Sequence, residues 1–265
     1  PAVLLVEIAK KGGGLRELGV PTVSDRIAQM VAKMYFEPNV DPIFHPDSYG
    51  YRPGKSAIEA IGVARKRCWR YNWVLDLDIK GFFDNIDHEL LMRAVRKHTD
   101  SKWLLLYIER WLKAPVQIAD GTLVNREKGS PQGSVISPLL ANLFLHYAFD
   151  EWMRRNYNNI PFERYADDIL VHCKSERQAR WIKATIEKRL NQCGLELHPE
   201  KTRLIEFGRF AAQNRQRQGK GKPETFDFLG FTHFWGKSLK GNWVVKKKTK
   251  RKRLNRSMKA IWIWC

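Results

Sequence analysis

The sequence has few cysteines and no long apolar run. Its four cysteines, Cys68, Cys173, Cys193 and Cys265, include no close pair, which argues against a disulfide framework and against a thiolate zinc site. No apolar run approaches the roughly 18 residues that span a membrane. The first residues carry no basic region ahead of their apolar stretch and do not resemble a signal peptide. We therefore expect a cytoplasmic protein without a membrane partner.

Negative charge is also scarce. The chain holds 47 Lys and Arg against 28 Asp and Glu, a formal net charge of +19. Residues 237–259 contain 11 basic side chains and no acidic one, and Trp243, Val244 and Val245 inside this run indicate that part of it packs. Nucleic acid is the expected partner, because neutralising phosphates releases their counterions. Candidate contacts in this run are Lys246, Lys247, Lys248, Lys250 and Arg251.

Apolar residues make up 43% of the 265 residues, enough for a sizeable core in two packed units. Helices are predicted where apolar residues recur at helical spacing or follow a capping residue. They lie at 22–36 (with Ile27, Met30, Val31 and Met34 at helical spacing), at 56–67, from Asp87, at 137–155 with Ser137 as cap, and at 175–194.

Strands are predicted on both sides of a glycine turn at 10–14, at 71–83 and in an aromatic segment at 226–235. Residues 210–224 are low in apolar side chains and rich in Gln, Gly and Arg, which predicts a mobile loop.

The stretch "RYADDILVHC" (164–173) places Asp167 and Asp168 side by side before an apolar, β-branched run typical of a strand. A turn with two polar residues would explain an isolated pair. A metal site would need a third carboxylate, because two neighbouring aspartates do not complete one.

Asp78 is the candidate third carboxylate. In "VLDLDI" the apolar side chains alternate with Asp76 and Asp78, so both aspartates share one face of the predicted strand. We assign Asp76 no catalytic role. If this strand neighbours the strands flanking the Asp-Asp turn, Asp78 can converge on Asp167 and Asp168. Hard oxygen ligands suit Mg²⁺, and two such ions stabilise the attacking and leaving oxygens of a phosphoryl displacement.

Seven segments in a fixed order resemble the reverse transcriptases encoded by group II introns. They are "LRELGVP" (15–21), "SYGYRPGKSA" (48–57), "DLDIKGFFDNIDHELL" (76–91), "GSPQGSVISPLLANLFL" (129–145), "RYADDILV" (164–171), "GLELHPEKT" (194–202) and "FDFLGF" (226–231). The resemblance implies an α+β, right-hand polymerase fold and RNA-templated DNA synthesis. We expect fingers at 1–70, a palm at 71–235 and the basic start of a thumb at 236–265.

The resemblance also implies a role for individual residues. It makes Asp78, Asp167 and Asp168 the catalytic ligands of two Mg²⁺ ions, which Mn²⁺ can replace. Phe82 would stack under the nucleotide sugar and exclude a 2′-hydroxyl. The other implied nucleotide contacts are Lys10, Arg16, Gln132, Gly133 and Lys201. Arg52 is a candidate nucleic-acid contact, with pairing to a carboxylate as the alternative.

The expected partners are an RNA template, a DNA or RNA primer, deoxynucleoside triphosphates and structured intron RNA. Retrons and CRISPR adaptation modules contain reverse transcriptases with the same core, and they remain an alternative context. A second alternative is an RNA-binding maturase-type splicing or retrohoming factor with a non-productive polymerase core. A ribonucleotide polymerase is a third, which a gate at Phe82 would disfavour.

Overall fold

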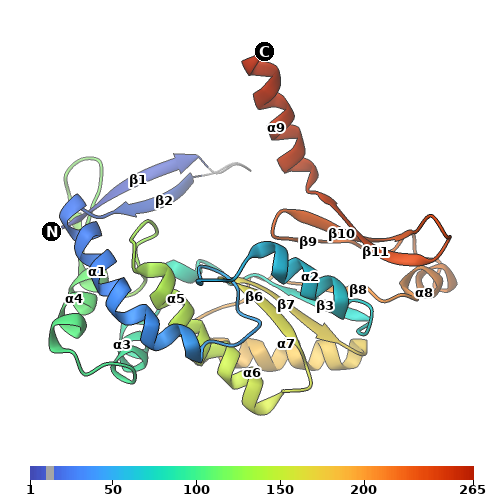
Figure 1. Ribbon diagram of the computed structural model, residues 1–265, viewed down its shortest axis with the longest axis horizontal. Coiled ribbons are helices and arrows are strands. Elements are labelled where there is room, and N and C mark those ends of the chain that lie inside the picture. The colour runs from blue at the N-terminus through green and yellow to red at the C-terminus, as the bar shows by residue number, and fades with distance from the viewer. Residues whose placement is uncertain (10–14) are drawn as a thin grey trace.

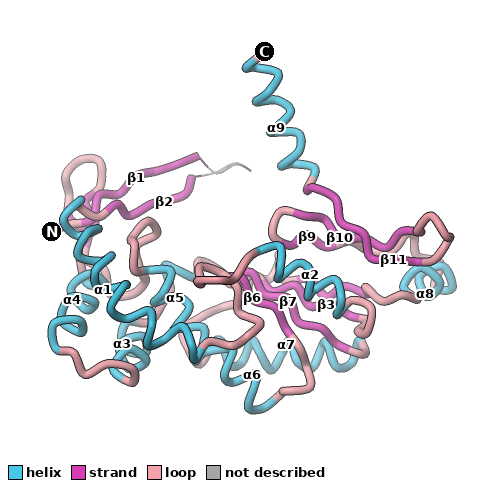
Figure 2. Tube along the Cα trace, viewed as in Figure 1, coloured by secondary structure: helices cyan, strands magenta, loops and turns pink. Residues whose placement is uncertain are grey.

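The computed structural model describes residues 1–9 and 15–265, and its strands form three separate sheets (Figure 2). The N-terminal sheet has the order β2(Leu15–Val20)-β1(Val3–Ala9)-β4(Val116–Gln117)-β5(Leu123–Val124). The central sheet has the order β6(Phe162–Tyr165)-β7(Asp168–Cys173)-β3(Trp73–Leu77)-β8(Arg203–Glu206), with antiparallel neighbours throughout. The C-terminal sheet has the order β11(Trp243–Thr249)-β10(Phe231–Lys237)-β9(Phe226–Phe228).

Most helices pack around the central and N-terminal sheets, whereas α9 projects away from the body of the molecule (Figure 1). They are α1(Val23–Val40), α2(Ala57–Arg67), α3(His88–Arg96), α4(Lys102–Lys113), α5(Ser137–Leu145), α6(Glu151–Asn156), α7(Glu176–Asn191), α8(Ala211–Arg217) and α9(Arg251–Trp264). Short 3₁₀ turns lie at Asp41–Ile43 and Phe82–Asp84, and a π-helical segment, His146–Asp150, joins α5 to α6. Among the described residues no helix is long and apolar enough to cross a membrane.

The two faces of the central sheet are covered to different extents. Leu75, Leu77, Ile169 and Val171 point to one face and pack in a large core with α3, α5 and α7. On the other face, Val74, Leu170 and Ile205 pack against α2 and the C-terminal sheet. Side chains alternate between faces along a strand, so Asp76, Asp78 and Asp168 share the second face with Val74 and Leu170. The carboxylates therefore lie at the end of the sheet, next to the residues that pack against α2 and the C-terminal sheet.

Several helices begin where the sequence predicts. The hydroxyl of Ser56 accepts a hydrogen bond from the Glu59 amide at the start of α2, and Ser175 accepts one from Gln178 at the start of α7. Asp87 caps α3 in the same way through the Leu90 amide. Local hydrogen bonding of this kind depends on neighbouring residues only, so the sequence predicts it well.

The helix predicted at 22–36 forms, but the apolar residues that indicated it face outward. Ile27, Met30, Val31 and Met34 are 45–68% exposed. α1 instead buries Gln29, Ala32, Phe36 and Val40. Gln29 Oε1 accepts hydrogen bonds from Ser134 Oγ (2.7 Å) and the Val135 amide (2.9 Å), which satisfies its buried amide group. The hydrogen bonds of buried Gln29 thus help to determine which face of α1 is buried, and hydrophobic periodicity predicts a different face.

Three other local expectations were wrong. Ile136, not Ser137, is the N-cap of α5; Ser137 is the first helical residue, and its hydroxyl accepts a hydrogen bond from Ser130 Oγ. The single helix expected at 137–155 is interrupted by the π-helical segment. The loop expected at 210–224 contains α8, whose Ala211 is buried and whose Asn214 donates to Glu206 of β8. β10 (Phe231–Lys237) runs across residues 235 and 236, and the palm–thumb boundary expected there stays a prediction.

Candidate active site

Asp78 and Asp168 lie opposite each other at the end of two neighbouring strands. β3 and β7 pair with Leu77 opposite Ile169, so Asp78 and Asp168 are the next positions in this register. β6 and β7 pair through Tyr165 and Asp168, which leaves Ala166 and Asp167 as a two-residue turn. The three predicted carboxylates therefore belong to one end of the central sheet, as expected.

The turn that carries Asp167 is held in an unusual backbone conformation. Ala166 has a φ of 56°, in the left-handed region that residues with a Cβ rarely adopt. Gly50 packs directly against it, because a Cβ at Gly50 would lie 2.4 Å from the Ala166 nitrogen. The segment "SYGYRPG" therefore supports the Ala166–Asp167 turn by close backbone contact, a role that sequence reasoning did not identify.

The charges at this end of the sheet repel one another. The pKa of Asp168 is raised to about 6, first because the surrounding chain displaces water and then because Asp167 and Asp78 are close. Its side chain still reaches solvent. The pKa of Asp76 is raised to about 7, mainly by burial and then by the charge of Asp168. Asp76 thus faces the same cluster, although we assigned it no role.

The residues fit a divalent cation by donor type. Carboxylate oxygens are the ligands that Mg²⁺ prefers, and the mutual repulsion of these groups favours a bound cation. Within residues 1–9 and 15–265, no group of three or more His, Cys, Asp or Glu side chains is gathered closely enough to hold a metal ion. The three aspartates share a location without a preformed coordination geometry.

Lys201 lies beside Asp78, and its predicted role at a nucleotide stays a prediction. Its Nζ is 3.5 Å from Asp78 Oδ1, and both side chains are partly exposed. The Asp78 backbone is fixed on both sides, because the His198 amide donates to its carbonyl (2.7 Å) and the Asp78 amide donates to Thr202 Oγ1 (3.4 Å). The segment "GLELHPEKT" thus anchors the strand end that presents Asp78.

A buried ion pair involves Arg164, two residues before Ala166 of the turn. Arg164 and Asp150 are fully buried and form two hydrogen bonds, Nε to Oδ1 at 2.7 Å and Nη2 to Oδ2 at 2.6 Å. Arg164 Nη1 also donates to Asn142 Oδ1 (2.9 Å) and to the Ala166 carbonyl (3.1 Å). Asn142 in turn donates to the Gly50 carbonyl (2.7 Å). These contacts connect both sides of the turn to α5 and the π-helical segment.

Gln132 and Gly133 lie against the N-terminal sheet. The Gln132 carbonyl accepts a hydrogen bond from the Gly19 amide (2.8 Å). Gly133 has a φ of 118°, and a Cβ there would lie 3.0 Å from the Gly19 carbonyl oxygen. Gln132 also lines a cavity of about 830 Å³ between the N-terminal sheet and residues 124–132. Its predicted role at a nucleotide remains a prediction.

Arg126 lines the same cavity, and we did not predict it. Its Nη1 is buried without a hydrogen-bond partner in the described part of the chain. Burial lowers the pKa of this guanidinium, while the charge of Asp84 opposes that shift. A buried donor without a partner is costly, so an anion in this cavity would stabilise it. No motif in the sequence distinguishes Arg126 from the other arginines.

The prediction that Phe82 contacts a nucleotide sugar was wrong. Phe82 is only 2% exposed and packs in the large core, with its ring centroid 6.4 Å from that of Phe144. The next residue, Phe83, is partly exposed and packs edge-on against Phe82. The 3₁₀ turn at Phe82–Asp84 directs adjacent side chains differently, so Phe82 is buried in the large core while Phe83 packs at its edge and is partly exposed.

The prediction that Arg52 contacts nucleic acid was also wrong, and the alternative is confirmed. Its side chain is 8% exposed and forms an ion pair with Asp41, with Nε 2.7 Å from Oδ1. Its remaining donors bond to Asp41 and to the carbonyls of His45 and Ser48. All five donors of the guanidinium are therefore used within the protein.

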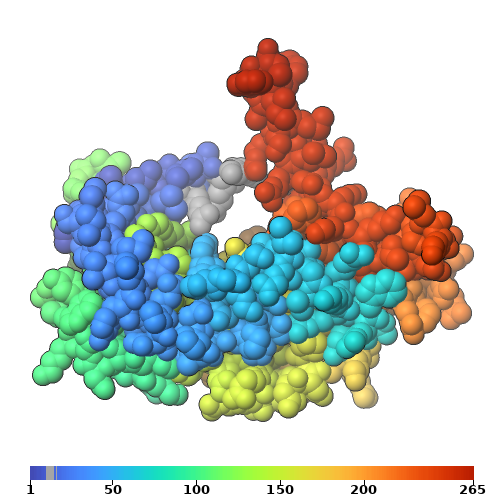
Figure 3. Space-filling model, in the orientation of Figure 1, coloured from blue at the N-terminus to red at the C-terminus, as the bar shows by residue number. Residues whose placement is uncertain are grey.

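The remaining predicted basic residues lie at the two ends of the chain. Lys10 lies outside the described residues, and Arg16 is placed in β2 opposite Ile8. Lys246, Lys247, Lys248 and Arg251 are exposed on β11 and α9. Lys250 is partly buried, with its Nζ 3.0 Å from Asp227 Oδ2. Figure 3 shows a hollow in the surface between the N-terminal strands and α9.

Comparison with known proteins identifies the family. The sequence model described as reverse transcriptase (RNA-dependent DNA polymerase) matches residues 8–233. The chain is 37% identical over 157 residues to Protein YkfC of Escherichia coli K12, covering 57% of this chain and 41% of the relative. It is 35% identical over 145 residues to the group II intron-encoded protein LtrA of Lactococcus lactis, covering 52% of this chain and 23% of the relative.

A relative in Saccharomyces cerevisiae, the putative COX1/OXI3 intron 2 protein, is 30% identical over 229 residues, covering 86% of this chain and 25% of the relative. The chain thus spans less than half the length of these curated relatives. These names confirm the resemblance to group II intron-encoded proteins.

Solved structures support the fold. Apo telomerase from Candida tropicalis superposes with a TM-score of 0.62 at 13% identity, covering 94% of this chain and 55% of the telomerase chain. Telomerase from Candida albicans gives a TM-score of 0.61 at 15% identity, covering 95% of this chain and 46% of that chain. The mixed α and β, right-hand polymerase architecture expected from the sequence is confirmed. The chain belongs to the reverse transcriptase (RNA-dependent DNA polymerase) family.

Proposed function

We propose that this chain extends a DNA or RNA primer on an RNA template with deoxynucleoside triphosphates. The observation that carries the proposal is the register of β3 and β7, which brings Asp78 opposite Asp168 beside the Asp167 turn. Family membership supports the reaction type, and the net charge of +19 supports nucleic acid as the partner.

In this proposal Asp78, Asp167 and Asp168 hold two Mg²⁺ ions, with Mn²⁺ as a substitute. Bound there, such ions supply charge stabilisation to the attacking and leaving oxygens of an in-line displacement. Asp78 keeps its position because His198 and Thr202 hold its backbone. Lys201, 3.5 Å from Asp78, brings a positive charge to the place where a triphosphate would lie.

Phe83 takes the role of sugar gate that we first gave to Phe82. Its partly exposed ring follows Asp78 by five positions and sits on the Phe82 ring, so it is supported from beneath. A rigid aromatic surface beside the sugar would clash with a 2′-hydroxyl. Gln132, Gly133 and Arg126 line or border the cavity beside it and are candidate contacts to the template or the nucleotide.

Structured intron RNA and a cytoplasmic location are further parts of the proposal. The similarity to LtrA supports the first. The second is supported by the free thiols of Cys68, Cys173 and Cys193, which are buried and unbridged within the described chain. The expected limits, with fingers at 1–70, palm at 71–235 and thumb from 236, also remain proposals.

Primer extension tests the proposal. An oligo(dT) primer on poly(rA) with dTTP and Mg²⁺ should be extended by the chain, while Asp168→Asn should lower incorporation at least about a thousandfold. RNA affinity, titrated in parallel at two salt concentrations, should be almost unchanged in the variant. Equal incorporation by both proteins would exclude the assigned site. Salt-sensitive RNA binding without incorporation by either protein would favour an RNA-binding factor with a non-productive core.

A further inference from the structure

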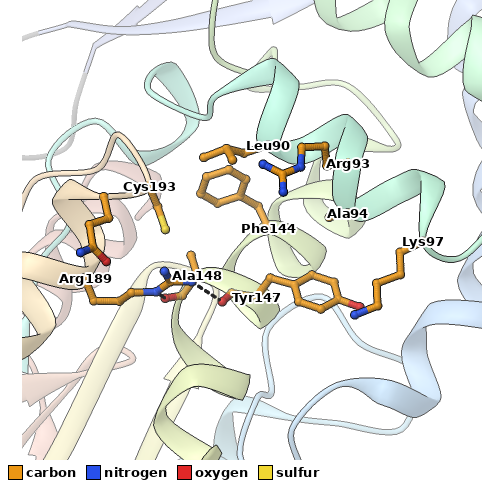
Figure 4. A pocket seen from close by; sticks show the side chains of 10 residues that line it. Leu90, Arg93, Ala94, Lys97, Phe144, Tyr147, Ala148, Arg189 and Cys193 are labelled. Atoms are coloured by element: carbon orange, nitrogen blue, oxygen red, sulfur yellow. Dashed lines mark hydrogen bonds between the residues drawn. The ribbon is translucent and has the colours of Figure 1, made fainter. Parts of the chain in front are cut away.

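A pocket of about 390 Å³ lies between α3, α5, the π-helical segment and α7 (Figure 4). α7 packs against the first face of the central sheet, where Ile182, Ile186 and Leu190 join the large core. The catalytic carboxylates lie on the second face. The pocket is therefore on the opposite side of the sheet from the proposed reaction. Its volume falls within the usual range of ligand sites, roughly 300–1,000 Å³.

The walls of the pocket are positively charged. Arg93 and Lys97 from α3 and Arg189 from α7 line it, and no acidic side chain does. Arg93 is exposed and forms no ion pair within residues 1–9 and 15–265. Lys97 Nζ lies 4.8 Å from the centroid of the Tyr147 ring. Three cations without a counter-charge around a small volume favour an anionic ligand.

Arg189 is held in place by the π-helical segment. Its Nε donates to the Ala148 carbonyl and its Nη2 to the Tyr147 carbonyl, each at 3.1 Å. The π-helical segment supplies these two carbonyl groups at the pocket wall, and π-helical turns of this kind are frequent at functional sites. The guanidinium is thus fixed at the pocket edge by two bonds, and its third nitrogen remains for a ligand.

The floor of the pocket is apolar and partly aromatic. Leu90 and Phe144 form it, and Figure 4 shows both beside the Arg93 guanidinium. The Tyr147 ring closes one side, and its hydroxyl is 2.6 Å from His98 Nε2. Burial and the charge of Lys97 lower the pKa of His98.

We propose that this pocket binds one nucleotide unit, with its phosphate at Arg93, Lys97 and Arg189 and its base or sugar against Leu90 and Phe144. Cations and an apolar floor on one small site match a phosphate joined to a flat, weakly polar ring. A nucleotide of a bound RNA chain and a free mononucleotide share this chemistry. We expect RNA, because the chain carries a net charge of +19 and belongs to an RNA-dependent family. The site does not depend on polymerase activity.

The test compares two double variants that each remove two exposed charges. Arg93→Gln/Lys97→Gln removes charges that line the pocket. Arg96→Gln/Lys102→Gln removes charges of the same two types from α3 and the start of α4, away from the pocket. RNA affinity is measured by fluorescence anisotropy with a 20-nucleotide RNA over a salt series. The pocket variant should bind about tenfold more weakly, with a salt slope reduced by about 1 for each lost contact, relative to the control variant.

Crosslinking of the wild-type chain locates the contact without any variant. RNA containing 4-thiouridine should crosslink to peptides spanning residues 144–148, and uridine 5′-monophosphate should compete. Crosslinks to uridine 5′-monophosphate alone, with RNA affinity independent of the pocket, would assign the site to free nucleotides. Equal RNA binding by the two double variants, with no crosslink in this segment to RNA or nucleotide, would overturn the proposal. Pocket-dependent binding of a polyglutamate peptide without nucleotide binding would also overturn it.

Primer extension by the pocket variant separates this proposal from the proposed function. At saturating template and primer, its incorporation rate should equal that of the wild type, because the altered residues lie on the other side of the central sheet. If neither protein incorporates nucleotides, the proposed polymerase function fails. The binding and crosslinking results still show whether the pocket binds a nucleotide unit.

Discussion

The central sheet and α9 present opposite physical environments. In β7, every residue after Asp168 is buried, and the sheet is packed on both faces. In α9, every residue from Arg251 to Cys265 is exposed, including Leu254, Met258 and Trp262. Figure 1 shows α9 projecting away from the body of the molecule. The carboxylates thus lie on a sheet packed on both faces, whereas α9, which carries five of the basic side chains of residues 237–259, is exposed along its length.

This difference separates two tasks. Chemistry on a phosphate requires side chains held within a fraction of an ångström, which buried strands provide. Binding a polyanion along its backbone requires charge and adaptable side chains, and it tolerates exposure. Substitutions in the central sheet should therefore change folding or catalysis, whereas substitutions in the basic C-terminal elements should change affinity and its salt dependence.

One of the two largest effects on stability is expected at the buried ion pair of Arg164 and Asp150. Asp150→Asn should lower the free energy of unfolding by about 3–5 kcal/mol, because it leaves the Arg164 charge buried without its partner. Glu151→Gln is the matched control, since the neighbouring Glu151 pairs with Arg154 and Arg155, whose side chains are 58% and 65% exposed. It should cost at most about 1 kcal/mol. If urea denaturation shows the same loss of unfolding free energy for Asp150→Asn and Glu151→Gln, burial of the pair does not add to the cost of breaking it.

Two adjacent phenylalanines should respond differently to truncation. Phe82→Ala should destabilise the chain by about 3–5 kcal/mol, because it opens a cavity beside Phe144. Phe83→Ala should be less destabilising and should raise the ratio of ribonucleotide to deoxynucleotide incorporation. Both variants are measured by urea denaturation and by single-nucleotide extension. An unchanged ratio of ribonucleotide to deoxynucleotide incorporation in Phe83→Ala would show that Phe83 does not exclude the 2′-hydroxyl.

Acid should weaken both the central and the C-terminal packing. Burial lowers the pKa of His146 and of His233 to about 4, below the usual value near 6.5. Protons therefore bind preferentially to the unfolded chain. The stabilisation is fully present above about pH 6.5 and is lost as the pH falls toward 4, by up to about 3 kcal/mol for each histidine. His146→Phe and His233→Phe should each reduce the loss of unfolding free energy between pH 7 and 4.5. A pH dependence identical to that of the wild type would contradict this.

The smallest effect is expected for a single lysine of the C-terminal sheet. Lys248→Gln should lower the unfolding free energy by at most about 1 kcal/mol, because the side chain is exposed and its Nζ lies 5.5 Å from the centroid of the Phe234 ring. It should weaken RNA binding modestly and reduce the salt slope by about 1. Lys174→Gln is the control, since this exposed lysine follows the end of β7 that is opposite to Asp168. Equal effects of the two substitutions on RNA affinity would show that total charge, and not the C-terminal elements, determines binding.

Predictions from the sequence succeeded where the signal was local or was carried by long motifs. The Ser56 and Ser175 caps and the alternation in β3 depend on residues a few positions apart. They failed where a residue's environment depended on distant partners. Phe82 and Phe83 are both aromatic and adjacent, and only the packing of Phe82 on Phe144 distinguishes them. Arg52 is buried because Asp41, His45 and Ser48 happen to surround it.

The sequence by itself determined the family, the helices and strands that caps and periodicity mark, and the choice of the three aspartates, because ordered motifs and local periodicity depend on residues close together in the chain. Only the tertiary structure decided that Asp78 lies opposite Asp168, that Arg164 and Asp150 are buried before the turn, and that Arg93, Lys97 and Arg189 converge on one pocket. Strand register, burial and the grouping of charged side chains all depend on segments far apart in the chain. Only the packing of the folded protein brings these segments together.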